Sequence, residues 1–222
     1  MPNDKMAIAI DGPAASGKSS TAKAVARTLG FRHVDSGSLY RAATAARARS
    51  GGASETWTEQ SVIDAAKIVS LTPVEHGFTP LLDGKPAESE MRSEAVTGSV
   101  SIVAKMPQVR DWVNSIVRGA GNEYDVVVDG RDIGKVVFPD ARLKIFLIAD
   151  PAERAKRRLL ERLHREPTDA EINVETVAIG RRDEMDEAQS GQAPGAVVID
   201  TTHLAQLEQI AQIVELARAA RG

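Results

Sequence analysis

The residues best suited to do chemistry form one glycine-rich octapeptide near the start of the chain. Residues 12–19, Gly-Pro-Ala-Ala-Ser-Gly-Lys-Ser, match the phosphate-loop pattern G-x-x-x-x-G-K-[ST] in full. Glycines let backbone N–H groups converge on a phosphate, the Lys18 ammonium can reach the outer phosphates, and the Ser19 hydroxyl can ligate Mg²⁺. The pattern predicts a nucleoside triphosphate site made by nine residues: Gly12, Pro13, Ala14, Ala15, Ser16, Gly17, Lys18, Ser19 and Ser20.

The segments around this loop are those that a phosphate loop requires. Residues 6–11 form a short apolar run typical of a buried strand, and residues 17–29 have a helical pattern. Four more short aliphatic runs follow at helix-length intervals, at residues 31–35, 126–129, 143–149 and 197–200. Short apolar strands alternating with helices predict an α/β fold, a five-stranded parallel sheet flanked by helices.

Two segments interrupt this alternation. Residues 49–105 lack a comparable strand. They contain a helical pattern at 61–69 and a hairpin signal at Asp83-Gly84, so we expect a small α+β insert. Residues 150–190 are rich in charge and helix formers, and Asp150, Pro151 and Glu153 are typical of a helix start. We expect a core of residues 1–48 and 106–222 that ends in a helix over residues 204–220.

Composition excludes several classes of protein. The 222 residues contain no Cys, which excludes disulfides and thiolate zinc sites, and only 4% aromatic residues, which disfavours base stacking on nucleic acid. The formal net charge of −3 is the wrong sign for a general polyanion binder. No apolar run is long enough to cross a membrane. We expect a cytoplasmic protein that binds no nucleic acid and no membrane.

Arginines at separate places suggest a second anionic ligand. Arg41, Arg110 and Arg131 stand far apart in the sequence, and a basic run at residues 154–165 contains Arg158. Arg that persists in an acidic chain favours specific anion contacts, although exposed helical Arg is an equally ordinary explanation for Arg41 and Arg110. No N-K-x-D tetrapeptide is present, which disfavours a GTPase. Asp129 ends an apolar strand as a Walker B acid does, so Ser19 and Asp129 are the candidate Mg²⁺ residues.

Five further segments resemble bacterial cytidylate kinase. They are residues 8–14 (IAIDGPA), 35–41 (DSGSLYR), 129–134 (DGRDIG), 136–141 (VVFPDA) and 182–186 (RDEMD). The resemblance runs from residue 7 to the last helix. It implies transfer of the γ-phosphoryl group of ATP to CMP or dCMP with Mg²⁺, on an adenylate-kinase-like sheet. It also implies that the insert at 49–105 binds the nucleoside monophosphate, that the Arg-rich segment is a closing lid, and that the enzyme is a monomer.

The resemblance also implies roles for single residues. Arg41 and Arg131 would hold the acceptor phosphate and, with Lys18 and Arg158, form the catalytic set of cations. The residues placed around the acceptor nucleotide are Ser36, Tyr40, Arg41, Ser101, Arg110, Asp129, Arg131, Asp132, Arg182 and Asp186. Among them Ser101, Arg110 and Asp132 would read the cytosine edge, and Arg182 and Asp186 would face the ribose.

Two departures from that family pattern keep alternatives open. Gln189 stands where the family usually has Arg, and Lys135 stands where it more often has Thr. We hypothesise that Lys135 partly compensates for the missing Arg. The alternatives are a small phosphate-loop kinase with another monophosphate or an alcohol as acceptor, and a nucleotide-binding module with impaired transfer. Paired Arg41 and Arg131 favour a monophosphate, because an alcohol acceptor would call for a nearby base.

Overall fold

Five parallel strands form the centre of the molecule. The computed structural model describes residues 5–186 and 191–222. The strand order across the parallel part is β2-β6-β1-β7-β8. Their bounds are β1 (Ala7–Asp11), β2 (Arg32–Asp35), β6 (Val126–Gly130), β7 (Leu143–Ile148) and β8 (Val197–Asp200). All five predicted strands and the predicted α/β class are confirmed.

Three more strands extend this sheet, of which the sequence predicted only a hairpin at residues 83–84. β4 (Gly77–Leu82) pairs antiparallel with both β3 (Val69–Val74) and β5 (Lys85–Pro86). β4 also pairs with β2 in the parallel direction, through His33 and Gly77. The expected turn at residues 83–84 does link two strands, β4 and β5. The longer β3–β4 hairpin escaped prediction because Pro73 and Pro80 lie within its strands, and proline normally argues against a strand.

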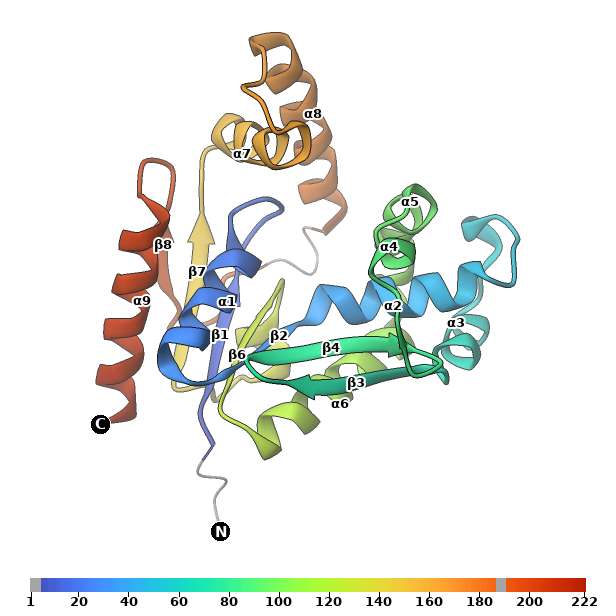
Figure 1. Cartoon of the computed structure of the whole chain (residues 1–222), viewed down its shortest axis with the longest axis horizontal. Helices are drawn as coiled ribbons and strands as arrows, with labels where there is room; N and C mark the ends of the chain where they lie inside the picture. Colours follow the sequence, from blue (N-terminus) through green and yellow to red (C-terminus); the bar gives the residue numbers. More distant parts are fainter. Residues whose placement is uncertain (1–4, 187–190) are drawn as a thin grey trace.

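Helices cover both faces of the parallel strands (Figure 1). On one face, α1 (Lys18–Leu29) and α9 (Gln206–Arg221) bury Val25 and Ile213 against Ile8 and Ile145. On the other face lie α2 (Ser36–Ala48) and α6 (Pro107–Glu123). Strands buried on both faces explain why the sequence shows continuous apolar runs rather than alternation.

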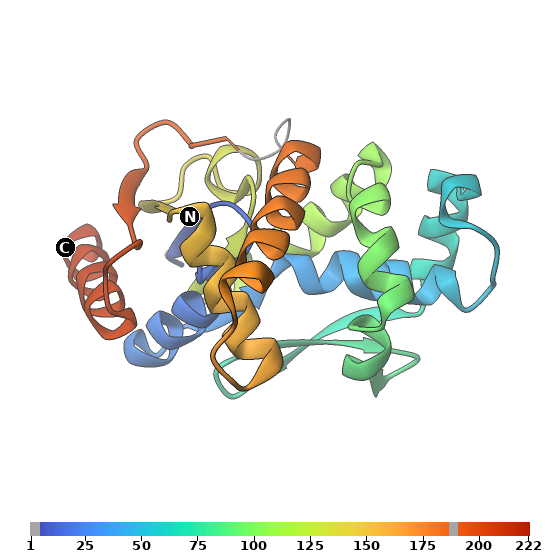
Figure 2. The ribbon, with the colours of Figure 1, turned by 90° about the horizontal axis from the view of Figure 1, so that it is seen from above.

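Two helices form a hairpin above the carboxyl ends of the strands. They are α7 (Pro151–Leu163) and α8 (Asp169–Asp186), and Figure 2 shows them lying over the middle of the molecule. Asp150 caps α7, since its Oδ1 accepts from the N–H groups of Ala152 at 2.8 Å and Glu153 at 3.3 Å. The buried Glu175 of α8 forms ion pairs with Arg158 and Arg162 of α7.

The remaining helices surround α2. They are α3 (Glu59–Ala66), α4 (Glu88–Met91) and α5 (Glu94–Val103), with a short turn η1 (Ser54–Thr56). The expected helix at 61–69 therefore begins and ends earlier, because Val69 already starts β3. A further turn, η2 (Ile133–Val137), follows β6. Within the described ranges, none of the helices has the length and apolar character needed to span a lipid bilayer.

Candidate active site

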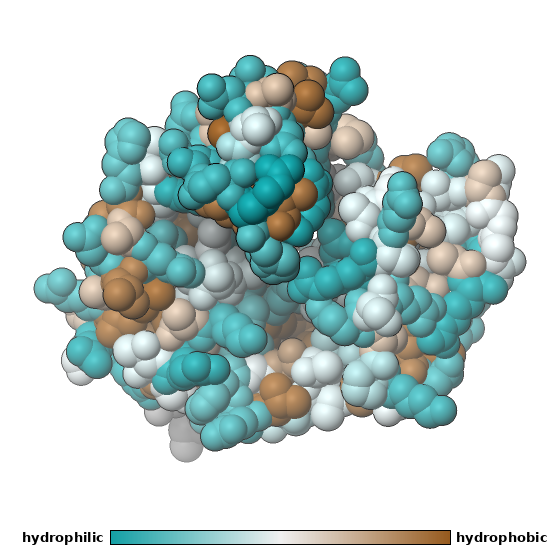
Figure 3. Space-filling model, turned by 45° about the horizontal axis from the view of Figure 1, so that its top comes forward, coloured by the Kyte–Doolittle hydropathy of each residue, from teal (hydrophilic) through white to brown (hydrophobic). Residues whose placement is uncertain are grey.

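A cleft of about 800 Å³ lies at the carboxyl ends of the strands, between the α7–α8 hairpin and the helices α4 and α5. Figure 3 shows this hollow beneath the hairpin, with mostly hydrophilic residues around its rim. Most of the residues singled out in the sequence line it: Ala14, Ala15, Ser16, Gly17, Lys18, Ser19, Ser20, Ser36, Tyr40, Arg41, Ser101, Arg110, Asp129, Arg131, Asp132, Arg158 and Arg182. The fold thus brings segments from across the whole chain to one cavity.

The phosphate loop enters this cleft from the end of β1. Gly12 is required by close packing, because a Cβ there would lie 2.3 Å from the backbone oxygen of Leu147. Gly17 has a φ of 83°, and Ala15 adopts a left-handed φ of 56°, which is strained for a residue with a side chain. Lys18 Nζ donates to the carbonyl of Pro13 at 2.6 Å. Burial, and then the nearby Arg131, lower the pKa of Lys18 to about 7.

A hydroxyl and a carboxylate meet beside Lys18. Ser19 Oγ donates to Asp129 Oδ2 at 2.5 Å, and the other carboxylate oxygen of Asp129 lies 2.6 Å from His33 Nε2. Next to this pair, burial and the charge of Asp129 raise the pKa of Asp35 to about 6. Mg²⁺ favours hard oxygen ligands and usually takes only one or two from the protein, the rest coming from phosphates and water. The donor set of Ser19 and Asp129 therefore fits Mg²⁺.

Other residues of the cleft lining form polar pairs with one another or with the backbone. Arg110 makes an ion pair with Asp132, and its Nη1 donates to the carbonyl of Ala104 at 3.2 Å. Burial is the main factor that raises the pKa of Asp132. Ser36 Oγ donates to the carbonyl of Asp129 at 2.8 Å, and burial raises the pKa of Tyr40 to about 12. Such fixed donors and acceptors can read the edge of a planar ligand.

Several guanidinium groups face the same cavity. Arg41 donates to the carbonyl of Met91 and the hydroxyl of Thr97. Burial lowers the pKa of Arg41, and the charges of Arg92 and Arg158 lower it further. Neighbouring guanidinium groups repel one another, and together they create a positive electrostatic potential in the cleft. The arrangement is suited to a ligand with concentrated negative charge.

Asp11 positions the loop after β6, a role that its place at the end of an apolar strand does not reveal in the sequence. Its two carboxylate oxygens accept the N–H groups of Ile133 and Gly134, both at 2.8 Å. Burial raises the pKa of Asp11 to about 6. Because these N–H groups directly follow Arg131 and Asp132, Asp11 fixes the segment that carries both cleft residues.

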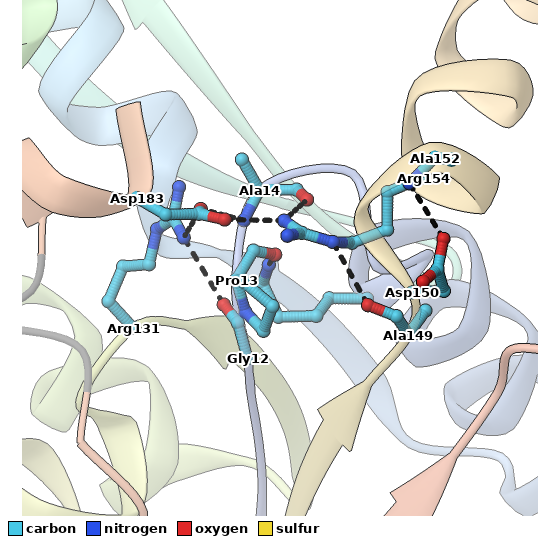
Figure 4. A network of polar contacts seen from close by, with 10 residues as sticks. Gly12, Pro13, Ala14, Arg131, Ala149, Asp150, Ala152, Arg154 and Asp183 are labelled. Atoms are coloured by element: carbon cyan, nitrogen blue, oxygen red, sulfur yellow. Dashed lines mark hydrogen bonds and ion pairs between the residues drawn. The ribbon is translucent and has the colours of Figure 1, made fainter. Parts of the chain in front are cut away.

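A polar network joins the phosphate loop to α7 and α8 (Figure 4). Asp183 Oδ1 accepts the N–H of Ala14 at 3.1 Å, and Asp183 Oδ2 lies 2.6 Å from Arg154 Nη1. Arg131 Nη1 donates to the carbonyl of Gly12 at 3.3 Å and lies 4.0 Å from Asp183 Oδ1. Asp183 was missed, although it stands inside the RDEMD segment, because only its neighbours were assigned roles.

Some predicted residues do not line the cleft. Gly12 and Pro13 belong to the phosphate loop but are absent from the lining. Asp186 ends α8, but its side chain and the whole of Gln189 lie outside the described residues. Lys135 is exposed on η2 and is absent from the lining, so its proposed compensation stays a prediction.

Another part of the lining was missed by the sequence analysis. It contains Arg157, Leu204 and Gln209. Arg157 is held by Thr201, and Gln209 Nε2 donates to Thr21 Oγ1 at 2.8 Å. Only Arg157 carried a signal in the sequence, as a member of the basic run.

Comparisons with known proteins agree with this geometry. The cytidylate kinase family model matches residues 8–219. The cytidylate kinase of Geobacillus kaustophilus is 42% identical over 98% of this chain and 99% of its own length. That of Chlorobaculum tepidum is 40% identical, over 94% of this chain and 91% of its own. A solved gluconokinase from Sinorhizobium meliloti 1021 covers 99% of this chain and is covered over 95% of its own, with a TM-score of 0.51 and 14% identity, which supports the fold alone. A family match over nearly the whole chain, joined to a complete phosphate loop that shares one cleft with several arginines, places this chain in the cytidylate kinase family.

Proposed function

We propose that this protein transfers the γ-phosphoryl group of ATP to CMP or dCMP, which yields ADP and CDP or dCDP. The observation that carries this function is one cleft whose lining contains both the phosphate loop and the arginines Arg41, Arg110 and Arg131. One polyanion held by backbone N–H groups and a second held by guanidinium groups would meet in line. Family membership identifies the acceptor as a cytidine monophosphate.

The reaction needs positioning and charge neutralisation rather than a general base. The acceptor phosphate has a second pKa of about 6, so it is largely ionised at neutral pH. One of its oxygens forms a bond to the γ-phosphorus while the bond to the β,γ-bridging oxygen breaks and ADP leaves. Lys18, Arg41, Arg131 and Arg158 would neutralise the charge that spreads over the transferred group.

The metal site would be made by Ser19 and Asp129. Mg²⁺ bound there with the triphosphate would neutralise phosphate charge and orient the β- and γ-phosphates. The hydrogen bond between Ser19 Oγ and Asp129 Oδ2 supports this assignment, because it already brings both oxygen ligands together. His33 would hold the second oxygen of Asp129 in place.

Recognition of cytosine would rest on Asp132, with Ser101 and Arg110. The exocyclic amine of cytosine donates a hydrogen bond, whereas uracil presents a carbonyl at the same position. A carboxylate accepts from the amine and repels the carbonyl, so the wrong base leaves a buried polar group unpaired. The Arg110–Asp132 ion pair supports this role, because it holds the carboxylate in one orientation.

The two segments that flank the cleft would act as moving parts. We assign residues 49–105 as the domain that binds the nucleoside monophosphate and residues 150–190 as the lid. Arg182 and Asp186 would face the ribose from the end of α8. Closure would exclude water, which would otherwise accept the phosphoryl group and waste ATP. Action as a monomer without nucleic acid stays a prediction.

A panel of acceptors tests the function. ADP release is measured with CMP, dCMP, UMP, AMP and GMP, with Lys18→Ala as the inactive control. Turnover with CMP and dCMP far above the other acceptors supports the proposal. Turnover with AMP or GMP but not CMP would replace it with another monophosphate kinase. ATP binding without turnover of any acceptor would indicate a nucleotide-binding module.

A further inference from the structure

The carboxylate of Asp183 links the lid helix α8 directly to the backbone of the phosphate loop. It accepts the N–H of Ala14 at 3.1 Å, while its partner Arg154 donates to the carbonyl of the same residue at 2.9 Å. Both polar groups of Ala14 are thus held from the lid (Figure 4). The next residue, Ala15, has the strained φ of 56°. A strained conformation persists only where its surroundings enforce it, so these contacts help to maintain the loop.

The lid hairpin has a second link besides the ion pair of Asp183 with Arg154. α7 and α8 are already joined by the buried Glu175, whose two oxygens lie 3.2 Å from Arg158 and from Arg162. Asp183 also lies in the last turn of α8, where the helix dipole disfavours a carboxylate. The helix dipole therefore disfavours the charge of Asp183, and the contacts of its carboxylate with Arg154 and with the Ala14 N–H offset this cost.

The partner of Asp183 is fixed and buried. Arg154 is 5% exposed, and its Nε donates to the carbonyl of Ala149 at 3.2 Å. On the other side, Arg131 lies 4.0 Å from Asp183 Oδ1 and donates to the carbonyl of Gly12. Asp183 therefore stands between a buried structural arginine and an arginine of the cleft. A change in its position would move both the loop and Arg131.

We propose that Asp183 is a positioning residue that couples binding at the two nucleotide subsites. Arg182, its neighbour on α8, lines the cleft, and the inference rests on the proposed acceptor role of that residue. An acceptor nucleotide bound by Arg182 would hold the end of α8 in one position. Asp183 would then hold Ala14 and Arg131 in place through its contacts with both. By thermodynamic reciprocity, a triphosphate that orders the loop strengthens acceptor binding by the same factor.

Asp183→Asn tests the coupling. Asparagine keeps an oxygen for the Ala14 N–H but removes the charge and presents an NH₂ group to Arg154. Glu184→Gln is the matched control, because it makes the same chemical change at the exposed neighbouring position. Calorimetry gives the Kd of CMP with and without a non-hydrolysable ATP analogue and Mg²⁺. In the wild type we expect the analogue to tighten CMP binding by a factor of about 5–150.

In Asp183→Asn the factor by which the ATP analogue tightens CMP binding should fall to about one. The Kd of CMP alone should change less than about twofold, and kcat should fall at least about tenfold. Glu184→Gln should retain the wild-type factor. If Asp183→Asn does not fold, Arg154→Lys, which keeps the buried charge but loses the planar fork, should give the same loss. No coupling in the wild type, or full coupling in whichever of these variants folds, overturns the inference. Absence of CMP turnover by the wild type would instead overturn the proposed function.

Discussion

The imidazole Nε2 of His33 lies 2.6 Å from Oδ1 of Asp129. The two residues come from neighbouring parallel strands, β2 and β6, and both are largely buried. Asp129 Oδ2 is engaged on its other side by Ser19 Oγ. The carboxylate that we assign to Mg²⁺ is therefore held between the phosphate loop and a histidine that lies outside the cleft lining.

Replacing this histidine should weaken metal use. In His33→Phe an aromatic ring still fills the position, but the hydrogen bond to Asp129 is lost. The carboxylate of Asp129 can then rotate away from Ser19. Outer partners of metal ligands typically contribute on the order of 10–100-fold to metal affinity. We expect the Mg²⁺ concentration for half-maximal ATP binding to rise by about tenfold or more, as measured by calorimetry at several Mg²⁺ concentrations. His76→Gln, at an exposed turn, should leave it unchanged; an equal rise in both variants would contradict the prediction.

Lys18 should take up a proton when the triphosphate binds. Burial and Arg131 lower its pKa to about 7, so near pH 8 most Lys18 side chains are neutral. Bound phosphate charge favours the ammonium and raises the pKa again. Uptake should therefore approach about one proton at pH 8, and ATP affinity should fall as the pH rises above about 7. Calorimetry in buffers of different ionisation enthalpy measures this uptake directly.

Two lysine variants check this assignment. Lys18→Arg keeps a cation that stays charged at all accessible pH values, so its uptake should vanish. Lys23→Met removes an exposed lysine of the same helix and should retain uptake. Persistent uptake in Lys18→Arg would show that another group accepts the proton.

Structural features that depend on one short segment could be predicted from the sequence, whereas those that depend on contacts between distant segments could not. The phosphate loop and the five parallel strands were predictable because their patterns are short and contiguous: fixed glycine spacing, and apolar runs buried on both faces. Asp11, Arg154 and Asp183 were not, because their partners lie more than 120 residues away or on another helix. An aspartate that ends a strand or a helix has the same local pattern whether it meets water or a buried N–H group.

Asp132 should decide between cytosine and uracil. Asp132→Asn replaces an acceptor with an amide that can donate to the uracil carbonyl, and it breaks the ion pair with Arg110. The ratio of kcat/KM for CMP to that for UMP should fall by at least about tenfold, since unpaired buried polar groups are the strongest source of discrimination. Steady-state assays with both acceptors measure this ratio. Asp140→Asn, an exposed carboxylate beyond the same loop, should leave it unchanged; an unaltered ratio in Asp132→Asn would remove Asp132 from base recognition.

Gly12→Ala should strongly lower kcat/KM for ATP without unfolding the chain. The new Cβ would lie 2.3 Å from the carbonyl oxygen of Leu147, which is backbone of β7 and cannot rotate away, so the phosphate loop must shift. Shifts of about 1 Å in positioning groups can reduce rates by on the order of 100-fold, and we expect at least this loss in kcat/KM for ATP. Gly30→Ala is the matched control, because it also has a positive φ but has open space around its Cβ at the end of α1. It should lower the free energy of unfolding by about 1–2 kcal/mol and leave kcat/KM unchanged. Thermal melts and steady-state assays on both variants distinguish the two effects, and normal ATP kinetics in Gly12→Ala would mean that close packing of the loop on β7 does not set its binding geometry.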